Sequence, residues 1–404
     1  MGASAERRRT WRVRGVAGAL GLLLTGTAAP LAHADTVRSQ QWYLDAMHAD
    51  EMWEVSTGRG ITVAVIDTGV DATLPDLDGQ VLEGKDFTGQ GGDAHTDSFQ
   101  HGTTIAALIA GSGKRSDRDG SFGLAPGTKI LPLRVTDGSE AKNEAEAARG
   151  FSATVSAAIR YAADSDAKIL NISMGQESDS KEISEAVRYA LAKGKLIFAA
   201  VGNGGEKGNA AEYPAASPGV VGVSAISRDG TSTKESQSGP QVDLAAPGEE
   251  IVSACAGGSE LCRSHGTSAA TALASASAAL IWSVHPNWTA NQVTRVLINT
   301  AGGATTGEKR TDSIGYGAVR PRIALKDPGD PGPANVNPLP GSPTEADNSP
   351  NPTPSKPTGA MPPREESASN AGKALMWTGI GLGVAAAAAA GIAVPVVITR
   401  RRRA

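Results

Sequence analysis

Apolar runs rich in β-branched residues alternate with Ala-rich stretches along the middle of the chain. The apolar runs are predicted to be strands buried on both faces, and they lie at 61–66, 130–135, 169–174, 196–201 and 220–226. The Ala-rich stretches have helical length and lie at 101–111, 152–164, 180–193, 267–284 and 289–300. This alternation predicts an α/β fold in which right-handed crossovers place helices on both faces of a mainly parallel sheet. Its chemistry is expected at the carboxyl ends of the strands.

Two segments fall outside this pattern. Residues 35–58 precede the first strand and are interpreted as a short pro-segment or as an N-terminal extension that packs on the domain. Residues 136–150 are polar and are predicted to form a mobile loop. Gating of a cleft and proteolytic processing are its two candidate roles.

The N-terminal end has the three parts of a secretory signal peptide. Residues 7–14 are basic, residues 15–31 are uncharged and apolar, and Ala32-His33-Ala34 forms a small-x-small cleavage site. The pattern predicts a signal peptide over 1–34, with an uncleaved anchor helix as the alternative. Export of the rest of the chain is therefore expected.

The C-terminal end has the pattern of a membrane anchor. About half of the chain's 23 prolines lie in a segment without aromatic residues, so 327–372 is predicted to be a Pro-rich, disordered linker. The stretch 373–399 is apolar and is predicted to span the membrane, and the basic tail 400–404 is expected in the cytoplasm. The expected location is the cell membrane, with a single span and an extracytoplasmic domain.

Composition and charge narrow the class of protein. With 40% hydrophobic residues, 20% charged residues and 2 cysteines, the chain is neither fully disordered nor a disulfide-rich miniprotein. The two ends carry +4 and +5, which leaves −13 for 35–372 within the total of −4. An acidic middle gives no support for binding nucleic acid. In an exported chain, Cys255 and Cys262 are predicted to form a disulfide that closes a short loop.

Two side chains with acid–base chemistry stand next to predicted elements. Asp67 follows the strand 61–66, although a simple turn aspartate is also compatible with Asp67-Thr68-Gly69. His101 opens the helix 101–111, and His265 is the only other histidine near a candidate nucleophile. An aspartic-protease site needs two Asp-Thr-Gly carboxylates that share a proton, and the sequence contains this motif only once.

A hydroxyl and an amide complete the set. Ser268 begins an Ala- and Ser-rich helix, where the positive helix end stabilises developing negative charge; an ordinary N-cap serine is the alternative. Asn203 follows the strand 196–201 and can donate to an oxyanion, although an Asn-Gly turn explains it equally well in isolation. A hydroxyl nucleophile needs a base, an orienting carboxylate and oxyanion donors, so the four residues support one another.

Eight segments in order make the chain resemble the subtilisin-like serine proteases over 40–325. They are VAVIDTGVD (63–71), HGTTIAALIAG (101–111), GLAPGTKILPLRV (123–135), NISMG (171–175), AAVGN (199–203), YPAASPGVVGVSA (213–225), LAAPG (244–248) and HGTSAA (265–270). The chain order Asp, His, Asn, Ser is the one that this family uses. The opening segment, the Pro-rich stalk and the tail anchor are similar to those of mycosins, the membrane-anchored proteases of actinobacterial type VII secretion systems.

The resemblance implies a peptidase domain over 59–326 and assigns roles to its residues. Asp67 would orient His101, His101 would act as general base and then acid, and Ser268 would form the acyl-enzyme. Asn203 and the Ser268 backbone N–H would form the oxyanion hole. The primary specificity pocket would include Ser173, Met174, Gly175, Val201 and Gly202.

Three residues depart from the family pattern and leave the catalytic groups in place. Ala269 and Ala272 stand where a bulky residue and a proline are usual, and Gln100 replaces the glycine often found before the histidine. No cofactor or metal is expected, and the acids of the first loops are interpreted as solvated: Asp76, Asp78, Asp93 and Asp97.

The expected function is peptide-bond hydrolysis at the outer face of the cell membrane. The expected substrates are proteins or peptides, and type VII secretion components are candidate partners. The alternative is a structural or docking subunit of a secretion complex in which proteolysis is not needed. Replacing Ser268 by Ala separates the two hypotheses, because a purely structural role survives that change.

Overall fold

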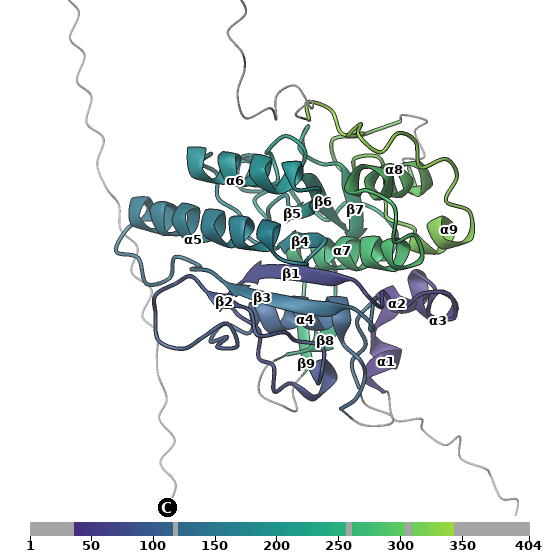
Figure 1. Ribbon diagram of the computed structural model, residues 1–404, viewed down its shortest axis with the longest axis horizontal. Coiled ribbons are helices and arrows are strands. Elements are labelled where there is room, and N and C mark those ends of the chain that lie inside the picture. The colour runs from purple at the N-terminus through teal and green to yellow at the C-terminus, as the bar shows by residue number, and fades with distance from the viewer. Residues whose placement is uncertain (1–35, 116–119, 256–260, 304–308, 343–404) are drawn as a thin grey trace, which may run out of the picture. The chain divides into compact units, whose positions relative to one another are not determined.

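The structure is a computed structural model, and it describes residues 36–115, 120–255, 261–303 and 309–342 (Figure 1). Its centre is a seven-stranded sheet with the order β2-β3-β1-β4-β5-β6-β7, in which every strand pair is parallel. The strands are β1 (Thr62–Asp67), β2 (Lys85–Asp86), β3 (Lys129–Arg134), β4 (Ile169–Ile172), β5 (Leu196–Ala200), β6 (Val221–Ile226) and β7 (Leu244–Pro247). A separate antiparallel hairpin pairs β8 (Ile251–Ala254) with β9 (Leu261–Ser264).

Helices cover both faces of the sheet, which confirms the predicted fold class. One hydrophobic cluster joins α5 and α6 to the sheet, and the other joins α4, α7 and α8 to its opposite face. The helices are α1 (Val37–Gln40), α2 (Trp42–Ala46), α3 (Ala49–Trp53), η1 (Pro75–Leu77), α4 (His101–Ala110), α5 (Glu144–Asp164), α6 (Lys181–Ala192), α7 (Thr267–Val284), α8 (Ala290–Thr300) and α9 (Pro321–Lys326).

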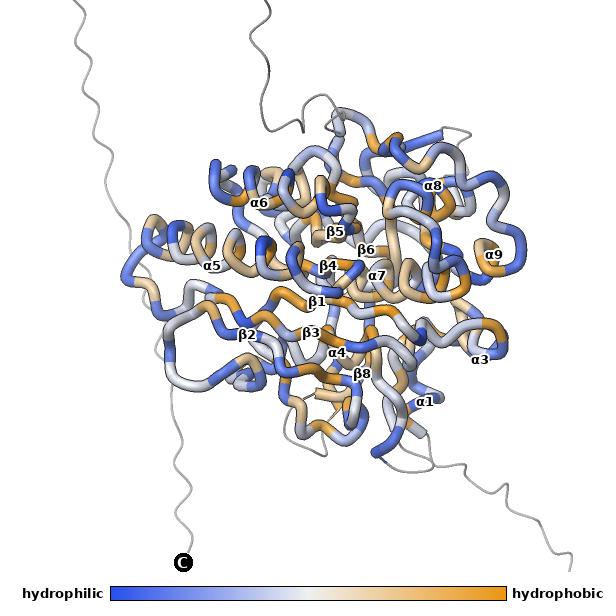
Figure 2. The backbone as a smooth tube through the Cα atoms, in the orientation of Figure 1, coloured by the Kyte–Doolittle hydropathy of each residue, from blue (hydrophilic) through white to orange (hydrophobic). Residues whose placement is uncertain are grey.

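Strand β1 shows how the sequence pattern produces this layering. Val63 and Val65 point into the cluster with α4 and α7, whereas Ala64 and Ile66 point into the cluster with α5 and α6. Successive side chains of a strand face opposite sides of the sheet, so burial on both faces requires a continuous apolar run. Figure 2 shows the corresponding concentration of hydrophobic residues along the central strands.

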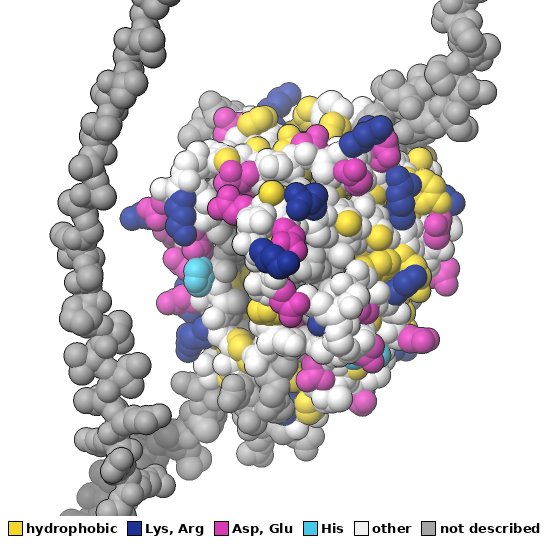
Figure 3. Space-filling model, turned by 90° about the vertical axis from the view of Figure 1, so that its left-hand side faces the viewer, with side chains coloured by type: hydrophobic (Ala, Val, Ile, Leu, Met, Phe, Trp, Pro, Cys, Tyr) yellow, Lys and Arg dark blue, Asp and Glu magenta, His cyan; other side chains and the backbone are white. Residues whose placement is uncertain are grey.

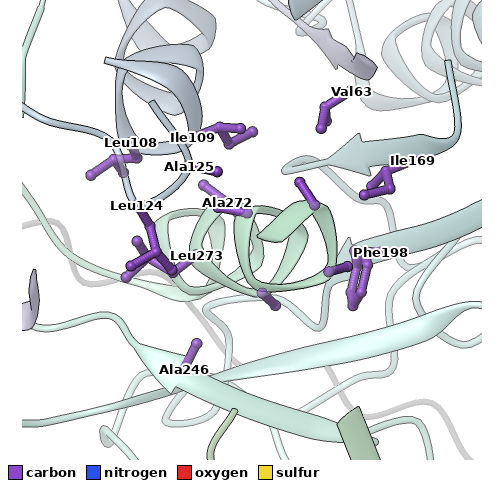
Figure 4. Close-up of a cluster of buried hydrophobic side chains, with 14 of the residues drawn as sticks. Val63, Leu108, Ile109, Leu124, Ala125, Ile169, Phe198, Ala246, Ala272 and Leu273 are labelled. Carbon is purple, nitrogen blue, oxygen red and sulfur yellow. The ribbon is translucent and has the colours of Figure 1, made fainter. Parts of the chain in front are cut away.

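Helix α7 is the buried spine of one layer. Its side chains are mostly Ala and Ser, and Figure 4 shows Ala272 and Leu273 of α7 beside Leu108 and Ile109 of α4. Small side chains let the two helices approach closely and leave room for the strands. By length and composition α7 could cross a membrane, but 83% of it is buried inside the domain, as in a core helix.

The segment 136–150 differs from its prediction, because α5 begins at Glu144. Asn143 is the N-cap, with its side-chain oxygen accepting from the Glu146 N–H at 3.0 Å. Glu144 and Glu146 lie in the first turn, where acidic residues favour the positive helix end. The segment is polar because this part of the helix faces solvent, and polarity alone does not exclude a helix.

The N-terminal extension packs on the domain, which is one of its two predicted arrangements. Tyr43 is fully buried, and its hydroxyl donates to the Val252 carbonyl at 3.0 Å. Gln41 is also buried and donates to the Phe122 carbonyl at 2.7 Å. These bonds tie the helices α1 and α2 to the hairpin β8–β9 and to the segment before β3.

The first part of the predicted linker, up to residue 342, is bound rather than extended. Arg295 of α8 donates to the carbonyls of Pro331 at 2.8 Å and Val336 at 2.6 Å. Gln292 donates to the Gly332 carbonyl at 3.0 Å. These are main-chain acceptors, so composition did not indicate them. The rest of the linker lies outside the described residues, as do the predicted signal peptide, membrane span and basic tail.

One of the acids that we interpreted as solvated is buried. Asp76 is fully inaccessible and accepts from the Arg115 and Ser121 N–H groups at 3.1 and 3.2 Å. Its other oxygen lies 3.3 Å from Arg115 Nε. Burial raises the pKa of Asp76, and the bonds to Arg115 and Ser121 act against that shift. This carboxylate therefore organises the loop before β3.

Candidate active site

The register of three neighbouring strands brings the predicted residues to one edge of the sheet. Ile66 of β1 pairs with Ile172 of β4, and Ile172 pairs with Ala199 of β5. Asp67 is the next residue after Ile66, and Ser173 is the next residue after Ile172. Because adjacent strands lie about 4.8 Å apart, these two positions are neighbours. Figure 3 views the side of the molecule at which these strands end, with acidic and basic side chains interspersed on that face.

Asp67 and His101 form a hydrogen-bonded pair. Asp67 Oδ1 lies 2.7 Å from His101 Nδ1, and the Asp67 side chain is fully buried. The carboxylate accepts the bond, so Nδ1 carries the proton and the Nε2 atom is left as the basic nitrogen. The His101 side chain is 38% exposed, so part of the ring is accessible to solvent.

The electrostatic environment of His101 favours its protonated form. The charge of Asp67 raises the pKa of His101, burial lowers it, and the hydrogen bond to Asp67 and the charge of Asp97 raise it further. The net direction is upward. The imidazolium that forms when His101 accepts a proton is therefore stabilised by these two carboxylates.

A small network fixes the two segments that carry this pair. The Thr68 hydroxyl donates to Asp97 at 2.8 Å and accepts from the Gly102 N–H at 3.0 Å. Asp97 also accepts from the Thr103 N–H at 2.8 Å. A Cβ atom on Gly102 would collide with the Gly69 carbonyl. The glycine after the histidine is therefore required by the close approach of α4 to the turn that follows β1.

Ser268 lies in the first turn of α7 and is anchored to the end of β4. The Ser173 hydroxyl donates to the Ser268 carbonyl at 3.1 Å, and Ser268 Oγ donates to the Ser173 carbonyl at 2.9 Å. In the described part of the chain no hydrogen bond joins Ser268 to His101. A rotation about the Ser268 side-chain torsion is needed before the hydroxyl can give its proton to His101.

Thr267 sets the orientation of Asn203. The Thr267 N–H and hydroxyl donate to Asn203 Oδ1 at 2.9 and 3.1 Å. The Asn203 side-chain oxygen is thereby occupied, and Nδ2 is the remaining donor of this exposed residue. Thr267 is fully buried and was not among the predicted site residues, although it lies within the HGTSAA segment.

A cavity of about 340 Å³ adjoins Ser268 and Asn203. Four of the five predicted pocket residues line it, namely Ser173, Met174, Gly175 and Gly202. Val201 does not line it, because its side chain is fully buried in the cluster with α5 and α6. Ala200, within the AAVGN segment, also lines it, and Gly204, Lys207 and Glu212 line it although the sequence did not indicate them.

The remaining candidates lie apart from this cavity. His265 Nδ1 contacts Glu235 Oε2 at 2.8 Å, and its side chain is 74% exposed, so it does not take the position of a base for Ser268. Cys255, which directly follows β8, and Cys262 of β9 are joined as a disulfide, which is the predicted pairing.

A parallel sheet flanked by two helical layers, with these residues at the carboxyl ends of its strands, defines a subtilisin-like α/β protein. The profile of the subtilase family, Peptidase S8, matches residues 58–318, and the chain belongs to this family. This agrees with the resemblance drawn from the ordered motifs.

A serine proteinase of similar sequence supports the same assignment. The thermophilic serine proteinase of Bacillus sp. (strain AK1) is 37% identical over 211 residues, which is 52% of this chain and 49% of that protein. The chain thus spans about half the length of that relative.

Solved structures extend the likeness to mycosins. The crystal structure of MycP1 from Mycobacterium smegmatis superposes with a TM-score of 0.63 at 28% identity, covering 73% of this chain and 86% of MycP1. The periplasmic assembly from the ESX-5 inner membrane complex contains a chain that superposes with a TM-score of 0.64 at 26% identity, covering 83% and 92%.

Proposed function

We propose that the chain is a membrane-anchored, extracytoplasmic serine endopeptidase that hydrolyses peptide bonds through Asp67, His101 and Ser268. The observation that carries this is the bond between the buried Asp67 carboxylate and His101 Nδ1 at the end of β1. The neighbouring strand β4 leads to Ser173, which exchanges hydrogen bonds with Ser268. Its family and the subtilisin-like fold support the proposal.

The proposed reaction uses each group at a stated atom. Ser268 Oγ attacks the peptide carbonyl carbon while His101 Nε2 takes its proton, and the carbonyl oxygen becomes an oxyanion. Asn203 Nδ2 and the Ser268 N–H donate to that oxyanion. His101 then gives the proton to the leaving amine as the C–N bond breaks. Water attacks the resulting ester, the proton returns through His101, and Ser268 is regenerated.

A fluorophosphonate probe tests this function without a known substrate. The purified full chain is treated with the probe in detergent, and intact-mass spectrometry follows the adduct. One adduct is expected on the wild type, and none on Ser268→Ala or His101→Ala. A folded wild-type protein without an adduct would contradict an activated serine.

The second candidate function is a docking role within a secretion complex. The observation that favours it is the likeness to a chain of the ESX-5 periplasmic assembly. Under this hypothesis the membrane span 373–399 tethers the domain beside type VII secretion components. Secretion in a strain that carries only Ser268→Ala distinguishes the two functions, because a docking role persists and a required proteolytic role is lost.

A further inference from the structure

The cavity beside Ser268 contains a partly buried carboxylate. Glu212 lies in the loop between β5 and β6 and lines the cavity of about 340 Å³ together with Ser268 and Asn203. The next residue, Tyr213, exchanges backbone hydrogen bonds with Gln176 at 2.8 and 3.1 Å. These bonds tie the loop to the segment after β4, which forms one wall of the cavity.

Two glycines in opposite walls show where the carboxylate lies. A Cβ atom on Gly175 would be 2.6 Å from Glu212 Oε2, and a Cβ atom on Gly202 would collide with Glu212 Oε1. One oxygen therefore faces each wall, and the carboxylate lies across the space between them. A larger residue at either position would displace the Glu212 carboxylate.

A hydrogen bond holds the Glu212 carboxylate in place, and no described basic side chain forms an ion pair with it. Gln237 Nε2 donates to Glu212 Oε1 at 2.9 Å, and Gln237 is itself buried with its N–H bonded to the Gly202 carbonyl at 3.0 Å. Within the described residues no lysine or arginine forms an ion pair with Glu212. Burial raises the pKa of Glu212, the bond from Gln237 lowers it, and the charge of Glu177 raises it.

We propose that Glu212 selects substrates with Lys or Arg at P1, the residue immediately before the scissile bond. This inference rests on the proposed peptidase function, in which the P1 side chain enters the cavity beside Ser268. A Lys or Arg side chain enters the cavity from the side of Ser268 and brings its cationic end to the Glu212 carboxylate, which occupies the space between the two glycines. The cation then supplies charge-assisted hydrogen bonds to a carboxylate that has lost part of its water.

Lys207 also lines the cavity and carries the opposite charge. Its side chain is exposed, so solvent screens its field, whereas Glu212 is partly removed from water. The less screened charge decides the preference, and a cationic P1 side chain is favoured over an anionic one.

The test uses the full chain in detergent and peptides that differ only at P1: Lys, Arg, Met, Gln or Glu. A fluorophosphonate first counts active sites, so the function and the selectivity are measured separately. The kcat/KM for Lys or Arg is expected to exceed that for Met by on the order of 100-fold. Equal or faster cleavage after Met overturns the inference while leaving the peptidase function intact. A wild type that is not labelled overturns both.

Variants locate the effect at Glu212. Glu212→Gln removes the charge and keeps the shape, and it should reduce the Lys-to-Met ratio by about 30-fold or more. Glu177→Gln is the matched control, because it removes an exposed charge that acts on Glu212 from a distance; its ratio should change by less than about threefold. A Glu212→Gln protein that keeps the wild-type ratio contradicts the inference. Should this variant fail to fold, the wild-type peptide series alone decides.

Discussion

The site has an acid–base half, Asp67 and His101, and a serine half, Ser268 and Asn203. The two halves differ in how completely the folded chain already makes the hydrogen bonds that catalysis uses. Asp67 and His101 already share a 2.7 Å bond, and Thr68 and Asp97 hold the segments that carry them. In the serine half, Ser268 Oγ is turned to the Ser173 carbonyl. Asn203 Nδ2 donates to no acceptor in the described part of the chain.

The difference follows from what each half has to bind. The acid–base pair exchanges only a proton with the rest of the site, so the fold alone can arrange it in advance. The Ser268 hydroxyl, the Asn203 amide and the Glu212 carboxylate act on groups that only a bound substrate provides. Changes in the first half should therefore alter the chemistry of the free protein, and changes in the second half should depend on the substrate.

Asp67→Asn should give the largest effect and tests the first half. The amide is nearly isosteric, so the fold should persist, but it can donate to Nδ1 and leave the proton on the Nε2 atom. His101 is then unable to act as a base, and kcat/KM should fall about 10⁴-fold. Peptide hydrolysis is the measurement. Asp93→Asn, at an exposed turn, is the control, and an equal loss in both variants would contradict the assignment.

Asn203→Ala tests the serine half. It removes the Nδ2 donor, and kcat should fall about 10²- to 10³-fold. Asn203→Asp keeps an oxygen for the Thr267 donors but replaces the amide donor with an acceptor, so its loss should be larger still. Steady-state kinetics of both variants check the order. A decrease below about threefold for Asn203→Ala would remove it from the oxyanion site.

The pH profile separates the two halves further. Only neutral His101 can accept the serine proton, so a raised pKa moves the acid limb of kcat/KM above about pH 6.5, the ordinary histidine value. Below its midpoint the rate should fall about tenfold per pH unit. Asp97→Asn should move the midpoint down, because the charge of Asp97 contributes to the shift. A midpoint below about pH 6 in the wild type would contradict the pair.

The same pair should affect stability with the opposite trend. A histidine whose pKa is higher in the folded state stabilises the fold below the pKa of the unfolded chain. That contribution is lost as the pH rises through the folded pKa. Activity therefore increases across the interval in which this contribution to stability fades. Denaturant unfolding of the wild type and of His101→Ala across about pH 5–8 measures it.

Much of the sheet could be predicted because its strands are buried on both faces. The run at 61–66 corresponds to β1 with a shift of one residue. The strand β7 and the hairpin β8–β9 were missed, since β7 (LAAP) contains no β-branched residue and β9 is only partly buried. Such strands carry too little hydrophobic periodicity to be recognised.

The site was predictable where a motif carries the residue and not where packing does. Asp67 and Ser268 stand within recognisable segments, and strand register brings their neighbourhoods together. Glu212 reaches the cavity because Tyr213 pairs with Gln176 and because Gln237 binds its carboxylate. These contacts join residues far apart in sequence, so no local sequence pattern predicts them.

The smallest expected effect concerns the residue before His101. Gln100 is the N-cap of α4 and has φ of 63°, in the left-handed region where a side chain is strained. Gln100→Gly should relieve about 1 kcal/mol of strain, part of which the greater entropy of glycine in the unfolded chain offsets. Denaturant unfolding should show a net gain of no more than about 1 kcal/mol. Gln90→Gly is a control without that gain, because the backbone of Gln90 is not left-handed. Loss of stability in Gln100→Gly would show that its side chain contributes more than its backbone strain costs, and that the acid–base half tolerates strain to hold His101.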